Sequence, residues 1–137
     1  STERMAHAIA SGLMEHGLSV KLMNLHVFDH SDVMEEVWDA AAVFVGSATH
    51  NNGMLPKVAD MLTYMKGLKP KGKIGAAFGS YGWSGEAVKD IAGWLSDMGM
   101  EMPVDPVRLL FVPNHEQLAA CTEMGRSIGK IVADKLG

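Results

Sequence analysis

Two glycine-rich stretches hold the residues of this chain whose types and spacing are best suited to chemistry. The first runs from Gly46 to Gly53 (GSATHNNG), and its small and polar residues offer many backbone donors and acceptors with few bulky side chains in the way. The second runs from Gly79 to Gly85 (GSYGWSG) and carries Tyr81 and Trp83, separated by a single residue. Exposed aromatic side chains are costly unless they stack on something. Together the two stretches favour a binding site for a flat polar heterocycle.

Simpler interpretations exist for both stretches. The first contains the pair Asn52-Gly53, which is typical of a tight turn. A turn needs only about two such residues, however, and this stretch is much longer. Core packing explains the second stretch poorly, because its aromatic residues lie among glycines.

The start of the chain is a third candidate. Ser1 and Thr2 place hydroxyl groups at the beginning of a predicted helix, beside free backbone N–H groups and the positive end of the helix dipole. That combination suits a phosphate group. The same residues also suit an ordinary helix cap, and the sequence leaves both interpretations open.

The elements that would position these stretches alternate between strands and helices. Continuous apolar runs predict buried strands, and the alternating segment 19–25 predicts a strand exposed on one side. Apolar residues at helical spacing predict the helices, the last of which begins after Asn114 with Gln117 in the capping-box position. The predicted buried strands are 41–46, 73–78 and 107–112, and the predicted helices are 2–16, 32–38 (capped by Ser31), 54–65, 85–98 and the segment after 114.

This order predicts an α/β fold: a doubly wound parallel sheet in three layers, formed by residues 1–137 as one domain. In such a sheet, ligands bind beyond the carboxyl ends of the strands, where the strand order reverses. A strand order of 2-1-3-4-5 needs a central first strand, yet a helix pattern opens this sequence. We therefore expect the chain to be a fragment that lacks its first strand, or to have that place filled by another segment.

Composition excludes several classes of function. A net charge of -4 argues against nucleic-acid binding, and no apolar run has the roughly 20 residues of a membrane span. Lys66, Lys69, Lys71 and Lys73 cluster, which we interpret as a solvated turn. The single cysteine, Cys121, fits a reducing, cytoplasmic setting and falls where a small core residue is expected.

Side chains that could perform a reaction by themselves are sparse. His26 and His30 have the spacing of a metal pair on a helix, but the residues around them suggest a loop and no third ligand is evident. The predicted carboxyl edge carries no Ser/His/Asp set, paired carboxylates or phosphate-binding lysine loop. We therefore predict no catalytic residue and no metal ligand, and expect a cofactor to supply the chemistry.

The two stretches resemble the flavin-binding loops of one family. Gly46 to Pro56 (GSATHNNGMLP) and Phe78 to Glu86 (FGSYGWSGE) are similar to the two flavin-ring loops in the flavodoxin domain of flavodiiron proteins, also called A-type flavoproteins. Ser1 to Ala6 (STERMA) resembles the end of that family's phosphate loop and the start of its first helix. The resemblance covers nearly the whole chain, and the two ring loops together are more specific than either alone.

The resemblance implies an FMN-binding electron-transfer domain of an oxidoreductase. In such proteins the domain follows a metallo-β-lactamase-like domain whose diiron site reduces oxygen or nitric oxide. The flavin takes electrons from rubredoxin or a reduced deazaflavin and passes them to the iron of a neighbouring subunit in a head-to-tail homodimer. The family's histidine and carboxylate iron ligands do not occur in these residues, so any such reduction would take place on another domain.

The resemblance also assigns individual residues. Ser1 and Thr2 would bind the phosphate, one ring loop would line the ring and ribityl chain, and the other would cover the opposite side of the ring. Ala48 stands where the family usually has proline, which should loosen the first loop slightly. The ring-binding residues implied are Thr49, His50, Asn51, Asn52 and Gly53 in the first loop, and Ser80, Tyr81, Gly82, Trp83 and Gly85 in the second.

Two other functions remain as alternatives. A stand-alone flavodoxin, or a flavodoxin-like quinone reductase, would use the same flavin site without an iron domain, and the residues upstream of Ser1 would distinguish the two cases. A signalling receiver module would need a phosphoacceptor aspartate at a strand end. Ser47, Ser80 and Pro113 stand at those places instead, which makes a receiver the least favoured reading.

Overall fold

The centre of the molecule is a parallel three-stranded sheet. The computed structural model describes residues 2–50, 53–81, 85–110 and 113–136. Within them the strand order is β1-β4-β5, with β1 at one edge and β4 between its two neighbours. A short antiparallel hairpin, β2 paired with β3, follows β1. The strands are β1 (Ala42–Gly46), β2 (Thr49–His50), β3 (Gly53–Met54), β4 (Ile74–Tyr81) and β5 (Val107–Leu110).

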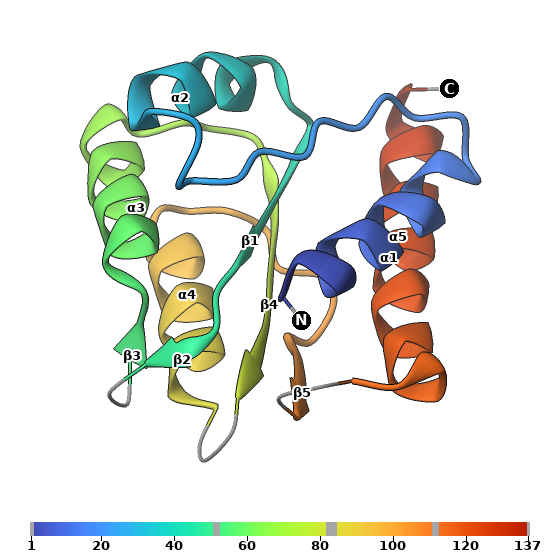
Figure 1. Cartoon of the computed structure of the whole chain (residues 1–137). Helices are drawn as coiled ribbons and strands as arrows, with labels where there is room; N and C mark the ends of the chain where they lie inside the picture. The colour runs from blue at the N-terminus through green and yellow to red at the C-terminus, as the bar shows by residue number, and fades with distance from the viewer. Residues whose placement is uncertain (1, 51–52, 82–84, 111–112, 137) are drawn as a thin grey trace.

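Helices cover the sheet on both faces, so the predicted three-layer α/β fold is confirmed (Figure 1). Two helices, α1 and α5, pack together on one face, and the other three lie on the opposite face. The helices are α1 (Thr2–Met14), α2 (His30–Asp39), α3 (Pro56–Leu68), α4 (Glu86–Asp97) and α5 (His115–Leu136).

Residues next to the helices determine where several of them begin and end. At the start of α5, Gln117 N–H donates to Asn114 Oδ1 and Asn114 N–H donates to Gln117 Oε1, both at 2.9 Å, so the predicted capping box is confirmed. Gly17 follows the end of α1 with a φ of +74°, a left-handed conformation that favours glycine. The cap predicted for α2 is wrong, because Asp29 holds the N-cap position and Ser31 Oγ donates to its carboxylate at 2.7 Å.

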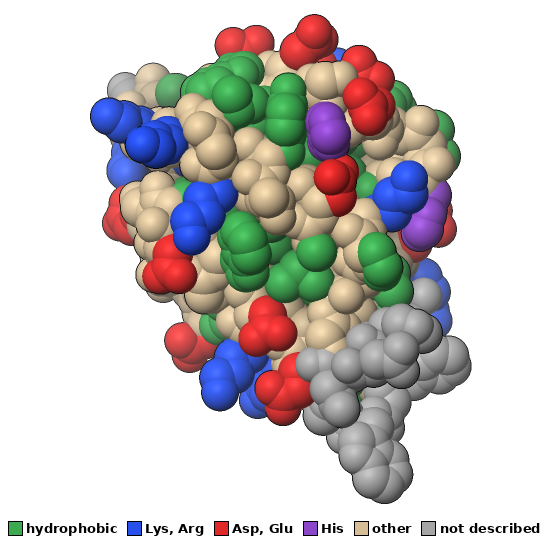
Figure 2. All heavy atoms as spheres, turned by 90° about the vertical axis from the view of Figure 1, so that its left-hand side faces the viewer, with side chains coloured by type: hydrophobic (Ala, Val, Ile, Leu, Met, Phe, Trp, Pro, Cys, Tyr) green, Lys and Arg blue, Asp and Glu red, His purple; other side chains and the backbone are tan. Residues whose placement is uncertain are grey.

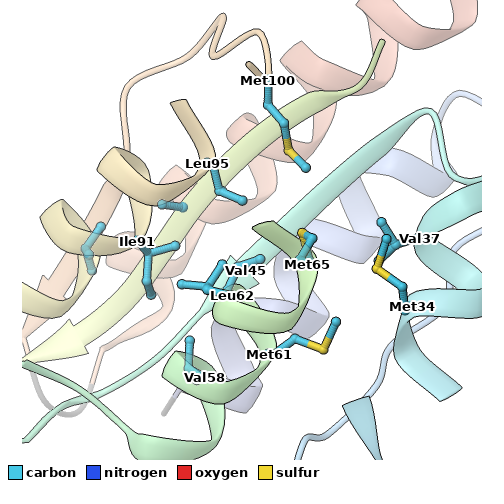
Figure 3. Close-up of a cluster of buried hydrophobic side chains, with 12 residues drawn as sticks. Met34, Val37, Val45, Val58, Met61, Leu62, Met65, Ile91, Leu95 and Met100 are labelled. Carbon is cyan, nitrogen blue, oxygen red and sulfur yellow. The ribbon is translucent and has the colours of Figure 1, made fainter. Parts of the chain in front are cut away.

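The core divides into two clusters, one on each face of the sheet. Figure 3 shows the first, where side chains of α2, α3 and α4 meet β1 on one face. The second joins α1 and α5 to the opposite face through Ile9, Leu13, Phe78 and Ile128. Cys121 belongs to this second cluster, and burial raises the pKa of its thiol to about 11, so its interpretation as a core residue is confirmed.

The three apolar strands differ in burial more than their sequences suggest. All residues of β4 but Tyr81 are buried, as predicted for a central strand. In β1 only Val45 is buried, and its neighbours are partly open. In β5 the burial alternates, with Arg108 and Leu110 exposed, so the prediction of a fully buried third strand is wrong. Each of these two strands has a single strand neighbour in the described sheet.

The strand predicted over 19–25 is also not formed. Residues 18–24 are extended without strand pairing and cross from the side of α1 and α5 to the side of α2 (Figure 1). Alternation of apolar residues gives a segment one suitable face, but a strand also needs a neighbour for its backbone hydrogen bonds.

One lysine departs from its predicted solvated turn. Lys66, Lys69 and Lys71 are exposed, whereas Lys73 is buried with its ammonium group donating to Trp38 O at 3.1 Å and Ala40 O at 2.7 Å. These carbonyls lie at the end of α2, where a cation also complements the helix dipole. Lys73 therefore ties the end of α2 to the beginning of β4.

Surface charge is mixed on the side of the molecule formed by α2 and α3. Acidic, basic and hydrophobic side chains are interspersed there (Figure 2), unlike the single-sign surface on which a nucleic-acid backbone binds. Among the helices described, none has the length and hydropathy needed to cross a membrane.

Candidate functional site

The predicted chemistry maps to the carboxyl edge of the sheet. The loop after β1 and the end of β4 lie side by side, because Ser47 N–H donates to Phe78 O at 3.3 Å. Helices α1 and α4 begin at the same edge, so their N-terminal N–H groups point towards it. Segments distant in sequence thus meet where a parallel sheet binds its ligands.

The start of α1 touches the end of β4 directly. Thr2 Oγ1 lies 2.9 Å from Ser80 Oγ, a hydrogen bond in which either hydroxyl can be the donor. Ser80 is buried, with 1% of its surface exposed, and Thr2 is half-buried. Glu3 follows in the first turn, but its carboxylate is exposed and lies 3.8 Å from His7 on the outer side. The N–H groups in the first turn of α1, beside the Thr2 hydroxyl, form a donor set suited to an anion.

A buried serine closes the first ring loop. Ser47 Oγ donates to Ala48 O at 2.7 Å and accepts from Leu55 N–H at 3.0 Å. These bonds join the two ends of the hairpin segment, where Thr49 and His50 pair with Met54 and Gly53. Sequence reasoning missed this clamp, because a serine followed by small residues gives no sign that its hydroxyl will be buried.

Thr49 connects the first loop to the next helix. Its Oγ1 accepts a hydrogen bond of 3.3 Å from Ala87 N–H in the first turn of α4. The hydroxyl therefore satisfies one of the unpaired donors at that helix start and keeps its own proton for another acceptor. Thr49 therefore lies at the carboxyl edge and anchors the loop to α4.

The second ring loop begins later than the sequence suggested. β4 extends through Tyr81, so Ser80 and Tyr81 lie at the end of a strand and not inside a loop. Gly79 allows this extension, since a Cβ atom there would overlap the carbonyl oxygen of Ser47 and lie 2.7 Å from Val88 Cγ2. The roots of the two ring loops are packed backbone to backbone at this glycine.

A basic residue beside the second loop was not among the predicted site residues. Gly85 occupies the N-cap of α4, and a Cβ atom added to it would lie 2.6 Å from Arg108 Cδ. The exposed Arg108 side chain therefore passes directly next to Gly85. The sequence does give a sign of this residue, because Arg108 is the one charged residue in the otherwise apolar run VRLLFV.

Some predicted site residues cannot be placed. Thr2, Thr49, Gly53, Ser80, Tyr81 and Gly85 all lie at or next to the carboxyl edge. His50 belongs to β2 by its backbone. The predicted residues that lie outside the described part of the chain are Ser1, Asn51, Asn52, Gly82 and Trp83.

His30, considered above as half of a metal pair, has a structural role instead. Its Nδ1 lies 2.8 Å from Asp60 Oδ2, and its ring stacks on Tyr64 with centroids 4.1 Å apart. The hydrogen bond with Asp60 raises the pKa of His30. These contacts link α2 to α3.

Comparison with known proteins decides which family has this architecture. The flavodoxin family model matches residues 1–125. The chain belongs to the flavodoxin family. An archaeal flavodoxin has a similar structure, with a TM-score of 0.83 and 36% identity over 96% of this chain and 90% of its own. This family membership confirms the predicted flavodoxin-like fold.

Greater identity is found with longer proteins, and a solved flavodiiron protein from Giardia intestinalis is 35% identical over 96% of this chain and 34% of its own, with a TM-score of 0.90. The rubredoxin-oxygen oxidoreductase of Megalodesulfovibrio gigas is 48% identical over 99% of this chain and 34% of its own length. The nitric oxide reductase of Moorella thermoacetica is 46% identical over 98% and 34%. A solved structure of the Desulfovibrio gigas oxidoreductase superposes with a TM-score of 0.97 over this whole chain. The flavodoxin chain described here spans about a third of the length of these relatives, and the resemblance to the flavodiiron family is confirmed.

FMN is the cofactor of this family, and the described residues fit it. The Thr2 hydroxyl and the first-turn N–H groups of α1 suit a phosphate, and the buried Ser80 hydroxyl at the end of β4 lies 2.9 Å from Thr2 Oγ1. The hairpin β2–β3 and the end of β4 present backbone groups and the half-buried Tyr81 beside them. A cavity of about 540 Å³ lies elsewhere, along the outer edge of β1, and is not part of this donor set.

Proposed function

We propose that this chain is the FMN-binding electron-transfer domain of a flavodiiron-type oxidoreductase. The observation that carries the proposal is the 2.9 Å contact between Thr2 and Ser80. It joins a helix N-terminus suited to phosphate with the strand that leads into the aromatic ring loop. The identity of 46% to 48% with oxidoreductases that act with rubredoxin or on nitric oxide, by their names, supports the same assignment.

The residues of the chain have distinct parts in this proposal. Ser1 and Thr2 hold the phosphate, and the first ring loop, Thr49 to Gly53, lines the ribityl chain and the ring edge. Ser80, Tyr81, Gly82, Trp83 and Gly85 cover the other side of the ring. When bound, FMN supplies reversible one- and two-electron transfer, and the protein tunes it through hydrogen bonds to the ring edge.

The whole protein would relay electrons between partners. Rubredoxin or a reduced deazaflavin is the proposed donor, and the acceptor is a diiron site on a metallo-β-lactamase-like domain that reduces oxygen or nitric oxide. The rubredoxin in the names of two relatives supports the donor. We also propose a homo-oligomer, and a single, buried cysteine supports its place in the cytoplasm. Residues 1–137 would then be one domain of a longer polypeptide, with the reduction performed elsewhere.

A stand-alone flavodoxin is the second candidate. The archaeal flavodoxin matches this chain over 90% of its own length, so the fold also suits a carrier without an iron domain. The coding sequence upstream of Ser1 distinguishes the two. An iron-binding domain there supports the first function, and a single strand after an initiator methionine supports the second.

Flavin binding is tested by titrating the purified chain, carrying its upstream strand, with FMN. We expect yellow protein and quenched flavin and tryptophan fluorescence. Trp83→Ala should weaken binding by about 1–3 kcal/mol, the range of aromatic–base stacking. Trp38→Ala is the matched control, since Trp38 is 48% exposed at the end of α2 and should leave affinity unchanged. Protein that stays colourless with excess FMN would refute the proposal.

A further inference from the structure

The root of the first ring loop is fixed against β4 by contacts on two sides. Ser47 N–H donates to Phe78 O at 3.3 Å, and a Cβ atom on Gly79 would overlap the carbonyl oxygen of Ser47. On the other side, a Cβ atom on Gly46 would overlap the Phe78 ring. The position of the Ser47 backbone is therefore set by the central strand of the sheet.

The side chain of Ser47 connects this fixed root to the far end of the loop. Ser47 is 1% exposed, and its Oγ accepts a hydrogen bond of 3.0 Å from Leu55 N–H. The same hydroxyl donates to Ala48 O at 2.7 Å. Its proton and one lone pair are therefore both used inside the loop, and they join residues that lie before and after the hairpin β2–β3.

The Leu55 N–H group depends on this one acceptor. Leu55 is the N-cap of α3, and Pro56 occupies the first turn that follows it. An N-cap N–H is often bonded by a Glu or Gln side chain at the third helical position, but Val58 stands there and offers no acceptor. Because the N–H points at a buried side chain, water can replace the serine hydroxyl only if the loop opens.

The hairpin itself adds little rigidity. Only two residue pairs join β2 to β3, and a hairpin of this size is marginal on its own. Its second attachment is the hydrogen bond of 3.3 Å from Ala87 N–H to Thr49 Oγ1, which lies on the α4 side. Ser47 is thus the residue that holds the loop to the start of α3.

We infer that Ser47 is a positioning residue that holds the first ring loop closed before FMN binds. The inference rests on the proposed FMN-binding function and extends it to a residue to which no flavin contact was assigned. Without the hydroxyl, the loop of the free protein is closed for only a fraction of the time. The apparent affinity for flavin falls in proportion to that fraction.

A positioning role has its own kinetic signature. Only the closed fraction accepts flavin, so the association rate falls, whereas a complex in which flavin holds the loop closed dissociates at the wild-type rate. Loss of a direct contact with flavin would mainly raise the dissociation rate. A residue that only stabilises the fold would lower Tm and change neither rate while the protein stays folded.

The test measures both rates by stopped-flow fluorescence, with the domain carrying its upstream strand as in the FMN titration above. Ser47→Ala should slow association by about tenfold, the loss of one or two net hydrogen bonds, and leave dissociation within about twofold. FMN and riboflavin should be affected equally, because the loop does not serve the phosphate. Ser47→Cys keeps a weak donor and acceptor, so its association rate should lie between those of Ser47→Ala and the wild type.

A matched control and a flavin-free measurement complete the test. Ser11 Oγ also donates to a backbone carbonyl, His7 O at 3.1 Å, but on the exposed side of α1, so Ser11→Ala should leave both rates within about twofold. In the protein without flavin, Ser47→Ala should speed amide hydrogen exchange at Leu55 by about tenfold or more.

The outcomes separate this inference from the function on which it rests. A wild-type protein that binds neither flavin would refute the proposed function and the inference with it. Flavin binding by the wild type, with unchanged association in Ser47→Ala, would overturn the inference alone. A loss confined to the dissociation rate would also overturn it, because Ser47 would then contact the flavin.

Discussion

β4 and β1 are neighbouring strands of similar sequence character, yet they lie in different surroundings. Residues 74–80 of β4 are all buried between β1 and β5. β1 is just as apolar, but most of it is half-open to the cavity on its outer edge. Each strand leads into one predicted ring loop. One loop therefore follows a strand that is paired on both sides, and the other follows a strand that is paired on one side in the described sheet.

The difference shows that burial of a strand depends on its neighbours as much as on its residues. An apolar run predicts that both faces of a strand can be buried, and helices do cover both faces of β1 and β4. Closure of the strand edges is a separate condition that needs hydrogen-bonded partners on both sides. Among the described strands, β4 meets that condition, whereas β1 meets it on one side only.

The largest expected effect comes from matched phenylalanines on the two strands. Phe78 of β4 is 5% exposed, whereas Phe44 of β1 is half-buried beside the cavity. Phe78→Ala should lower the free energy of unfolding by about 3–5 kcal/mol. Phe44→Ala should cost at least about 1 kcal/mol less, because part of its ring is already exposed. Urea unfolding of both variants measures the difference. An equal cost for Phe44→Ala and Phe78→Ala would mean that β1 is as closed as β4, contrary to the burial of the two strands.

A glycine pair tests the contact between the ring loops. Gly79→Ala places a methyl group against the Ser47 carbonyl and Val88, and should destabilise by about 1–3 kcal/mol. Because it separates the roots of both loops, FMN affinity should fall as well. Gly93→Ala, in α4 with open space around it, should stabilise by up to about 1 kcal/mol and leave FMN binding unchanged. Equal stability of the two variants in thermal unfolding would disprove the tight contact at Gly79.

The smallest effect concerns α2, which lines the cavity beside β1. The hydrogen bond with Asp60 raises the pKa of His30 above its usual 6.5. Its stabilising contribution is therefore fully present below about pH 6.5 and is lost as the pH rises through the raised pKa. Tm measured from about pH 5.5 to 8.5 should show this decline, and Asp60→Asn should flatten it. A decline of the same size in Asp60→Asn would assign it to another group.

Sequence reasoning reached the fold and both ring loops because their signals are local. Apolar runs, helical spacing and the Asn114–Gln117 capping box lie within single elements. It missed features set by contacts between distant segments. The close approach of Ser47 to Gly79 and the extension of β4 through Tyr81, which pairs with Leu110, both depend on residues far along the chain. Lys73 is buried for the same reason, since its partners are the carbonyls that end α2.

The most direct test of the central claim compares FMN with riboflavin, which lacks the phosphate. The wild-type domain, carrying its upstream strand as in the FMN titration above, should bind FMN more tightly than riboflavin in a fluorescence titration. Thr2→Val should weaken FMN binding by about tenfold, the loss of a hydrogen bond to a charged group. It should leave riboflavin affinity unchanged, while Thr2→Ser should retain FMN affinity. Equal losses for both ligands, or none for FMN, would contradict a phosphate site at the start of α1.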